Sequence, residues 1–479
     1  MAEISASFAA LRFGLGLRGE ATDPISKDLR DALLEEAATQ SELPGDGEGL
    51  EASPKILAEF RKFQVRRKEA LKAQRLAQLT GTPPTGKLGA EAVMQSETVP
   101  AQSMSPEMER PPQNVAYQKE LTAKYARLQA APFGFFERLV DFWANHFAVD
   151  ARRSGMTRAT VGSYEREAIR PNVLGRFEIM LSAVARHPAM LNYLDNWVSV
   201  GVNSRAAKRR PGRGLNENFG RELMELHTLG VDGGYDQADV RALANALTGW
   251  TIDFGLQRPE TVGKFVFQAQ RHEPGPVTVM GKTYPQKGEA QAAAIIADLA
   301  RHPATARHVS RKLVQAFVAD EPPPELVAKL ADVFLKTDGD LMAVAKALVT
   351  APESWQAPRA KLRSPQEFVI ASTRALGLTL KPAEITRSLV TLGQMYWQPL
   401  SPAGYPGDSR NWLAPDAMTN RLDVAQYMAA RAKPEDPMAI ADRVLGDLLT
   451  GSTREAIGRA ESPAQAYALL LMSPEFQRR

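Results

Sequence analysis

The residues best suited to chemistry fall in one short segment, 216–230, with the sequence NENFGRELMELHTLG. Its apolar residues recur at helical spacing, so we expect a helix here. At about 100° per residue, Asn218, Glu222 and Glu225 lie within about 60° of one another, on a stripe beside the apolar face. Two carboxylates and an amide at the edge of a semi-buried surface are typical of a site for acid–base catalysis or for a divalent metal ion.

Arg221 lies in the same stretch, one residue before Glu222 and four before Glu225. On one hypothesis, Asn218, Arg221, Glu222 and Glu225 are the catalytic residues of a metal-assisted or acid–base enzyme of unknown substrate. On the other, Arg221 pairs with the carboxylates and the polar helix only fixes helix packing. The protein would then be a non-enzymatic helical scaffold or partner protein. The spacing is compatible with both hypotheses.

A metal ion would need histidine and carboxylate ligands, because the chain contains no cysteine. His146 lies among aromatic residues at an expected helix end, and His272 lies beside an expected strand. We hypothesise that these two histidines approach Glu222 and Glu225 and that the four side chains hold a divalent metal. His227 points about 140° away from Glu222 on the same helix, so it is not included in this set.

Five cations precede the polar helix in the loop 204–214, which also contains glycine and proline. Because helix N-termini favour negative charge, Arg209, Arg210 and Arg213 are candidate ligands of an anionic cofactor. The loop lacks the Gly-Lys-Ser or Gly-Lys-Thr of a phosphate-binding loop. A basic loop of this kind is more often a solvated surface, and we favour that interpretation.

Aromatic residues gather again in the Pro- and Gly-rich stretch 396–412, at Tyr396, Trp397, Tyr405 and Trp412. They could line a groove for a sugar or a peptide, or they could seal the core beneath a long loop. The stretch has no paired acids at a recognisable spacing, so sealing is the favoured interpretation.

The elements that must position these residues are mainly helices. Apolar residues recur at helical period over 115–229 and again from Gly288 to the end of the chain. Two short apolar runs, 264–268 and 277–280, flank a Gly-Pro turn region, and we expect them to pair as a hairpin. The predicted fold class is therefore all-α, a predominantly helical globular body with one small β-hairpin.

Three regions are expected along the chain. Residues 1–79 form an N-terminal arm that ends in a long charged helix over 54–79. Residues 80–113 are rich in Pro, Gly, Ser, Thr and Gln, and this composition predicts a flexible linker or insertion. Residues 114–479 form the helical body, with the hairpin near 264–280.

Composition narrows the classes of partner. The net charge of +4 is small for 479 residues, and the cations are mostly offset locally, so nucleic-acid binding is not expected. Charged residues interrupt every apolar run, so no membrane span is expected. The first residues, MAEIS, do not have the basic start of an export signal. As written, the chain is expected to be cytoplasmic and soluble, or exported if a signal has been removed.

Several motifs together resemble a bacterial family catalogued as domain of unknown function 1800. They cover most of the chain outside 80–113 and comprise RFGLG at 12–16, FWANHF at 142–147, the segment 216–230, ALTGW at 246–250, HPATA at 302–306 and SPEF at 473–476. The resemblance implies a mostly helical protein without an established activity.

The resemblance also carries expectations about one motif and one partner. Where the family's hairpin motif looks like His-Asp-x-Gly-x-Lys, this chain has His272, Glu273, Gly275 and then Val277 in place of the lysine. Family members often look exported and are often encoded beside a protein similar to alkaline-phosphatase-type hydrolases. The resemblance therefore implies a hydrolase-like protein, encoded nearby, as a partner.

Overall fold

Helices form most of this chain, as the sequence predicts, and β-structure is confined to two small sheets. The computed structural model describes residues 4–18, 28–42, 49–80, 110–210, 212, 214–255 and 261–479. The predicted flexible segment 80–113 falls almost entirely in the gap from 81 to 109, outside the described residues. Its prediction as a linker, and the division of the chain that depends on it, stay predictions.

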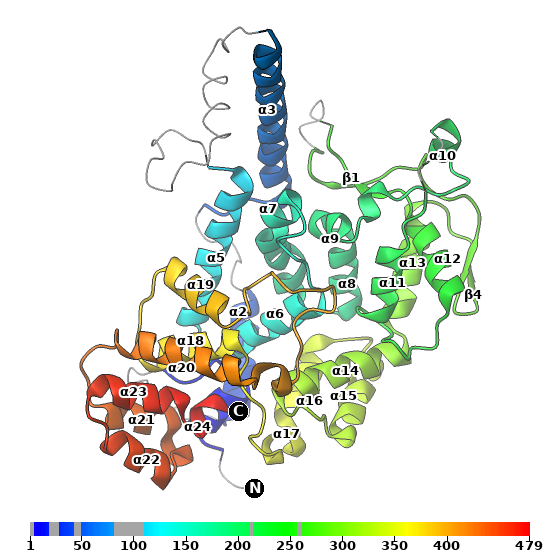
Figure 1. Cartoon of the computed structure of the whole chain (residues 1–479). Coiled ribbons are helices and arrows are strands. Elements are labelled where there is room, and N and C mark those ends of the chain that lie inside the picture. Colours follow the sequence, from blue (N-terminus) through cyan, green and yellow to red (C-terminus); the bar gives the residue numbers. More distant parts are fainter. Residues whose placement is uncertain are drawn as a thin grey trace.

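The first helices lead from the N-terminal part into the centre of the molecule. They are α1 (Ala6–Arg12), α2 (Leu29–Glu42), α3 (Ser53–Thr80), α5 (Pro112–Ala130), α6 (Phe135–His146) and α7 (Gly155–Tyr164), and α7 continues into a π-helical turn, Glu165–Ile169. The charged helix predicted over 54–79 is confirmed as α3, which projects from the rest of the molecule (Figure 1). It is too polar to cross a membrane, and no other described helix is long and apolar enough to do so.

Ten α-helices follow before residue 357 in the part of the chain that the structure describes. They are α8 (Phe177–Arg186), α9 (Pro188–Tyr193), α10 (Arg205–Arg209), α11 (Asn218–Glu225), α12 (Gln237–Leu247), α13 (Glu289–Ala300), α14 (Pro303–Phe317), α15 (Pro324–Lys336), α16 (Leu341–Thr350) and α17 (Pro352–Gln356). The last group is α18 (Pro365–Ala375), α19 (Pro382–Thr391), α20 (Pro415–Ala429), α21 (Pro437–Leu445), α22 (Gly451–Gly458), α23 (Pro463–Met472) and α24 (Pro474–Gln477).

Proline and short polar residues set many of these helix starts. Proline suits the first turn because its φ angle is already helical and that turn has no use for its missing N–H. Before α18, the Ser364 hydroxyl accepts a hydrogen bond from the backbone N–H of Glu367, and the Glu367 carboxylate accepts one from the backbone N–H of Ser364. This reciprocal cap fixes Glu367 at the start of the helix, where it faces several cations described below.

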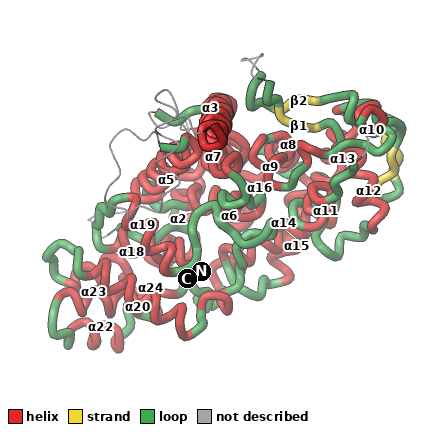
Figure 2. Tube along the Cα trace, turned by 45° about the horizontal axis from the view of Figure 1, so that its top comes forward, coloured by secondary structure: helices red, strands yellow, loops and turns green. Residues whose placement is uncertain are grey.

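The predicted hairpin between 264–268 and 277–280 is wrong in its pairing, although both segments contain strands. β2 (Phe265–Phe267) pairs antiparallel with β1 (Trp250–Ile252), and β3 (Val277–Val279) pairs with β4 (Lys282–Tyr284). Met280 and Gly281 both have positive φ angles, so they make a tight two-residue turn that brings β4 back onto β3. Figure 2 shows both sheets at the opposite end of the molecule from α22 and α23.

One continuous core joins the helices of the chain. Phe13 of α1's C-terminal end packs against Phe135 of α6, Phe317 of α14 and Trp355 of α17. Trp143 of α6 is also fully enclosed. The core thus places α6 centrally, with α14 on one side and α5 on another (Figures 1 and 2).

Candidate functional site

The predicted polar stripe lies on α11, which is shorter than expected. Glu222 and Glu225 are half-buried on one face, whereas Asn218 is exposed. Burial, and then the charge of Glu225, raise the pKa of Glu222. No hydrogen bond or ion pair reaches either carboxylate from the described part of the chain. The two carboxylates therefore do lie together, but without a compensating donor.

Arg221 does not neutralise these carboxylates as the scaffold hypothesis required. Its guanidinium donates to Oε1 of Gln237 at 2.8 Å and lies 3.7 Å from the carboxylate of Glu217. Its charge lowers the pKa of Glu222 only as the smallest of the three influences on that group. The buried Arg–Glu network proposed from the sequence is therefore not formed on this helix.

We expect Glu222→Gln to leave the fold unchanged or to stabilise it by about 0.5 kcal/mol or less, because the substitution removes a like-charge repulsion on a helix. Urea unfolding at pH 7.5 measures this change in stability. Arg221→Gln is the control, because it removes a positive charge from the same helix instead of a negative one. A loss of about 1 kcal/mol or more in Glu222→Gln would mean that its carboxylate has a stabilising partner.

The two predicted histidine ligands do not join Glu222 and Glu225. The ring of His146 faces the core, and its Nε2–H donates to the carbonyl oxygen of His227 at 3.2 Å. His272 is held at 3.0 Å from the carbonyl oxygen of Thr248, beside the β1–β2 sheet. No group of three or more histidine and acidic side chains among the described residues could hold a metal ion. The predicted four-ligand site is thus not assembled.

The two candidate anion-binding arginines that the structure describes lie on the surface. Arg209 ends the short helix α10, and Arg210 follows it, and both side chains are exposed. Arg213 lies outside the described residues. The exposure of the first two agrees with the interpretation of this loop as a solvated surface.

Two buried histidines and one half-buried histidine form a cluster that the sequence did not predict. His146, His227 and His308 meet where α6, the end of α11 and α14 come together, with ring centroids 6.3 and 6.0 Å from His146 to the other two. Burial, and then the charge of Lys312, lower the pKa of all three, to about 3 for His227 and about 4 for His308. The imidazoles are therefore neutral at physiological pH.

This cluster makes the fold sensitive to acid. A histidine in the unfolded chain has a pKa near 6.5. Between pH 6.5 and about 4, these histidines are therefore protonated in the unfolded chain but neutral in the folded protein. Stability should be greatest above pH 6.5 and should fall below it, by up to about 1.4 kcal/mol per pH unit for each histidine.

Urea unfolding at pH 7.5, 6 and 5 measures the effect. His227→Leu should reduce the pH dependence by about one proton, because neither ring nitrogen of His227 has a partner to lose. A free energy of unfolding that does not change with pH would contradict the burial of neutral imidazoles.

A different set of ionisable groups surrounds Lys124 of α5, in the centre of the molecule. Its ammonium is fully buried and lies 2.6 Å from Oδ1 of Asp141 on α6 and 2.8 Å from Oε2 of Glu165. Glu165 opens the π-helical turn and also accepts a hydrogen bond of 2.7 Å from the indole N–H of Trp397. Such turns are often found at functional sites, because they re-aim a side chain within a helix.

The two carboxylates beside Lys124 have opposite pKa shifts. Burial raises the pKa of Asp141 to about 6, even though Lys124 opposes this effect. Burial acts on Glu165 too, but Lys124, Arg170 and the Trp397 indole outweigh it and lower the pKa of Glu165. Paired carboxylates whose pKa values are driven apart are a common arrangement in acid–base catalysis.

Asp141 opens onto a cleft between α6 and α18. Its side chain is 23% exposed, unlike Lys124 at 0% and Glu165 at 2%. Asp141 lines two adjoining cavities of about 120 and 30 Å³, together with Asn145, Gln366 and Tyr405. Glu165 also lines the smaller cavity. Asp141 therefore lies between the cleft and the buried charges of Lys124 and Glu165.

The larger cavity is rich in cations. Arg138, Lys361 and Arg479 line it, with Glu367 as the one acid there besides Asp141. Arg138 and Arg479 each lie 3.0 Å from Glu367. Although burial opposes it, this pairing lowers the pKa of Glu367 to about 2.

In the aromatic stretch 396–412, some rings seal the core and others line a cavity. Tyr396 and Trp397 are buried against the Lys124 ammonium, which lies 4.8 and 5.7 Å from their ring centroids. Tyr405 and Trp412 instead line the larger cavity. The loop is fastened by Asn145, which accepts from the backbone N–H of Tyr405 at 2.7 Å and donates to its carbonyl oxygen at 2.9 Å.

The sequence held a signal for this cleft. Arg138, Asp141 and Asn145 occupy positions i, i+3 and i+7 of α6, so they share one face of a helix whose other residues are mostly apolar. Polar side chains at that spacing in a core helix indicate a buried polar site. Their partners on α5, α18 and the last residues of the chain are too distant in sequence to be paired by spacing alone.

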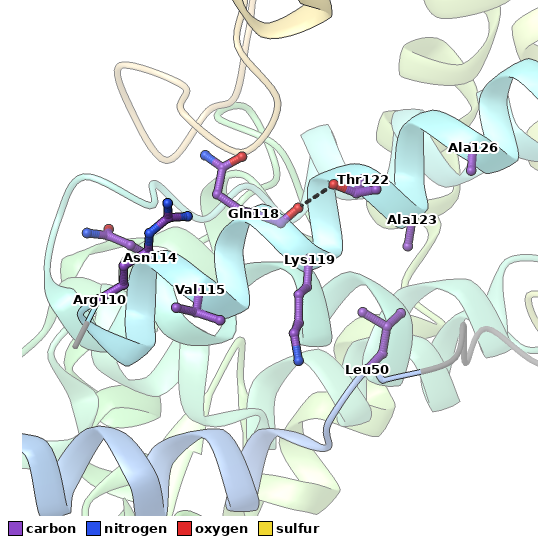
Figure 3. A pocket seen from close by; sticks show the side chains of 9 residues that line it. All are labelled: Leu50, Arg110, Asn114, Val115, Gln118, Lys119, Thr122, Ala123 and Ala126. Carbon is purple, nitrogen blue, oxygen red and sulfur yellow. Dashed lines mark hydrogen bonds between the residues drawn. The ribbon is translucent and has the colours of Figure 1, made fainter. Parts of the chain in front are cut away.

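A wider groove lies along α5, away from this chemistry. It has a volume of about 680 Å³ and is lined by Leu50, Arg110, Asn114, Val115, Gln118, Lys119, Thr122, Ala123 and Ala126 (Figure 3). Two of its lining residues are cations and none is an acid. In Figure 3, Lys119 points across the groove towards Leu50, where it donates to the Gly49 carbonyl oxygen at 3.3 Å. The groove offers no acid–base pair.

Comparisons with known proteins agree with the resemblance noted in the motifs. A family model described as "Protein of unknown function (DUF1800)" matches residues 9–478. No curated protein and no solved structure matches the chain.

Proposed function

We propose that this chain, which belongs to the DUF1800 family, is an acid–base enzyme in which Asp141 is the general base and the cleft binds a small anionic substrate. The observation that carries the proposal is the state of the Asp141 carboxylate. One of its oxygens is held by a buried ammonium, while the side chain opens onto a cleft and has a pKa of about 6.

The geometry suits proton transfer at one defined atom. Lys124 holds Oδ1 of Asp141, and nothing in the described part of the chain donates to Oδ2. With a pKa of about 6, the group is mostly ionised at neutral pH but still binds a proton readily. Oδ2 can therefore take a proton from a substrate, or from a water molecule that attacks it, and return the proton in a later step.

Lys124 and Glu165 are positioning residues in this account. Burial lowers the pKa of Lys124, but Asp141 and Glu165 outweigh burial and raise it, so the ammonium stays charged. Glu165 keeps its negative charge and balances the ammonium, so Lys124 does not hold the pKa of Asp141 near its usual low value. The pair thus keeps Asp141 oriented while leaving it basic.

The charges of the cleft favour an anionic substrate. Lys361 is paired with Asp320, and Asp141 with Lys124, but Arg138 and Arg479 share the single carboxylate of Glu367, so this pair of guanidinium groups keeps one positive charge without a partner. A volume of about 120 Å³ is close to that of a cavity of about 150 Å³ that accepts benzene, so it fits the reacting end of a small molecule. The rings of Tyr405 and Trp412 give one part of the wall an apolar surface.

The proposal is tested by screening purified protein against small chromogenic esters and amides that carry a carboxylate or a phosphate. Turnover should depend on Asp141 and should fall below about pH 6, as that group becomes protonated. The control is Asp332→Asn, which alters an exposed aspartate on α15 far from the cleft lining. Turnover that persists unchanged in Asp141→Asn would contradict the proposal.

A further inference from the structure

Lys312 of α14 differs from every other lysine in the described part of the chain. Among the lysines that the structure describes, only Lys124, Lys312 and Lys361 are not exposed. Lys124 pairs with Asp141 and Glu165, and Lys361 lies 2.5 Å from Asp320. Lys312 is half-buried and has no carboxylate or other hydrogen-bond partner among the described residues. An amine withdrawn from water without a counterion requires an explanation.

Lys312 lies close enough to the three neutral imidazoles for its charge to act on each of them. His308 lies one helical turn earlier on α14, so the two side chains share a face. Lys312 is also the charge that acts most strongly on His146 and His227, which approach from α6 and from the end of α11. Arg311 adds a further positive influence on His308. No acidic side chain contributes to the pKa shifts of Lys312, His227 or His308.

The hydrogen bonds of the histidines fix where a proton can be accepted. Nε2–H of His146 donates to the His227 carbonyl oxygen, and Nε2–H of His308 donates to the Leu226 carbonyl oxygen at 3.1 Å. Both rings therefore present Nδ1 as an acceptor. Nδ1 of His146 is fully enclosed, whereas Nδ1 of His308 and the nitrogen of Lys312 are not among the enclosed polar atoms without a partner. The open side of the cluster is thus at Lys312 and His308.

We propose that Lys312 is a nucleophilic amine that forms an imine with small aldehydes, with His308 as the adjacent proton acceptor. The neutral amine attacks the carbonyl carbon, and the carbonyl π electrons move to oxygen. A proton passes from the nitrogen to that oxygen through Nδ1 of His308, giving a carbinolamine. Water then leaves and the C=N bond forms, with no oxidant or reductant consumed. This activity is separate from proton transfer at Asp141.

The protonation state of Lys312 is consistent with this role. Burial lowers its pKa to about 8, so a substantial fraction of the amine is neutral at pH 7.5. An exposed lysine has a pKa near 10.4, and its neutral fraction at that pH is about 200-fold smaller. Desolvated lysines of this kind are the ones that act as imine-forming nucleophiles.

The experiment is reductive trapping on the full-length protein. Propanal is added at pH 7.5 with sodium cyanoborohydride, the reaction is stopped at low conversion, and labelled lysines are located by peptide mass spectrometry. Peptide mapping also separates Lys312 from the α-amino terminus, which has a low pKa in any protein. Lys312 should be labelled at least about tenfold faster than the exposed Lys329 and Lys346.

Three controls make the result decisive. Lys312→Arg should remove the fast adduct and leave labelling of Lys329 and Lys346 unchanged, and the preference should vanish in urea. His308→Gln should slow trapping at Lys312, and Asp141→Asn should not affect it. Labelling of Lys312 in the folded protein at or below the rate of the exposed lysines would overturn the proposal. Equal trapping in wild type and His308→Gln would overturn the role of His308.

Discussion

The Lys124→Met variant is expected to unfold with a free energy about 3–5 kcal/mol below that of the wild type. Lys124 is fully buried, and its ammonium is the cation nearest to Asp141 and Glu165. Methionine fills a similar space but leaves two buried carboxylates without their counterion, which is far more costly than removing a complete ion pair. Urea unfolding at pH 7.5 measures the loss.

Two comparisons separate this effect from the removal of any lysine. Lys119→Met, on an exposed face of the same helix, should change stability by about 0.5 kcal/mol or less. The double variant Lys124→Met/Asp141→Asn should recover part of the loss, because one of the two stranded charges is gone. If Lys124→Met were as stable as Lys119→Met, Lys124 would not be the counterion that Asp141 and Glu165 need in the core.

Asp141→Asn is expected to abolish most catalysis without weakening the fold. Removal of a general base typically lowers the rate by about 10²–10⁴-fold. Stability should stay the same or increase, because the folded pKa of about 6 lies above the unfolded value near 3.9. A group with a raised pKa binds its proton more tightly when folded, so stability falls as pH rises from about 3.9 to about 6, and above that the ionised form keeps its full cost.

This combination distinguishes a functional carboxylate from a structural one. If the attraction of Lys124 outweighed the burial of Asp141, the ionised carboxylate would stabilise the fold, and Asp141→Asn would destabilise the protein at pH 7.5. Two measurements are made on the same preparation of Asp141→Asn. One is the turnover of a substrate found in the screen, and the other is the free energy of unfolding in urea. A destabilised variant that retains its activity would contradict the proposed role of Asp141.

The features that were predicted correctly from the sequence are those that depend only on residues close together in the chain. Glu222 and Glu225 share a face of α11 because helical period alone determines that arrangement. The helical class and the charged helix α3 are predicted on the same basis. The pairing of β2 and β3 was wrong because two short strands of similar composition do not specify partners. The tight turn at Met280 and Gly281 decided the pairing of β3.

The cleft could not be predicted because its parts come together only in the folded chain. Glu367 meets Arg138 and Arg479, which lie 229 residues before it and 112 residues after it in the numbering. Asp141 acquires its pKa from burial and from Lys124 and Glu165, on different elements. His146 and His272 failed as metal ligands for the same reason, since the fold points each towards a backbone carbonyl.

The most direct test is the pKa of Asp141 itself, measured by ¹³C NMR on protein labelled at the aspartate carboxyl carbon. The signal is assigned by its absence from Asp141→Asn, and its shift is followed from pH 3.5 to 8. A midpoint near 6 is expected, because burial outweighs the Lys124 charge. A midpoint near 4, the value of an ordinary exposed aspartate, would contradict Asp141 as the general base.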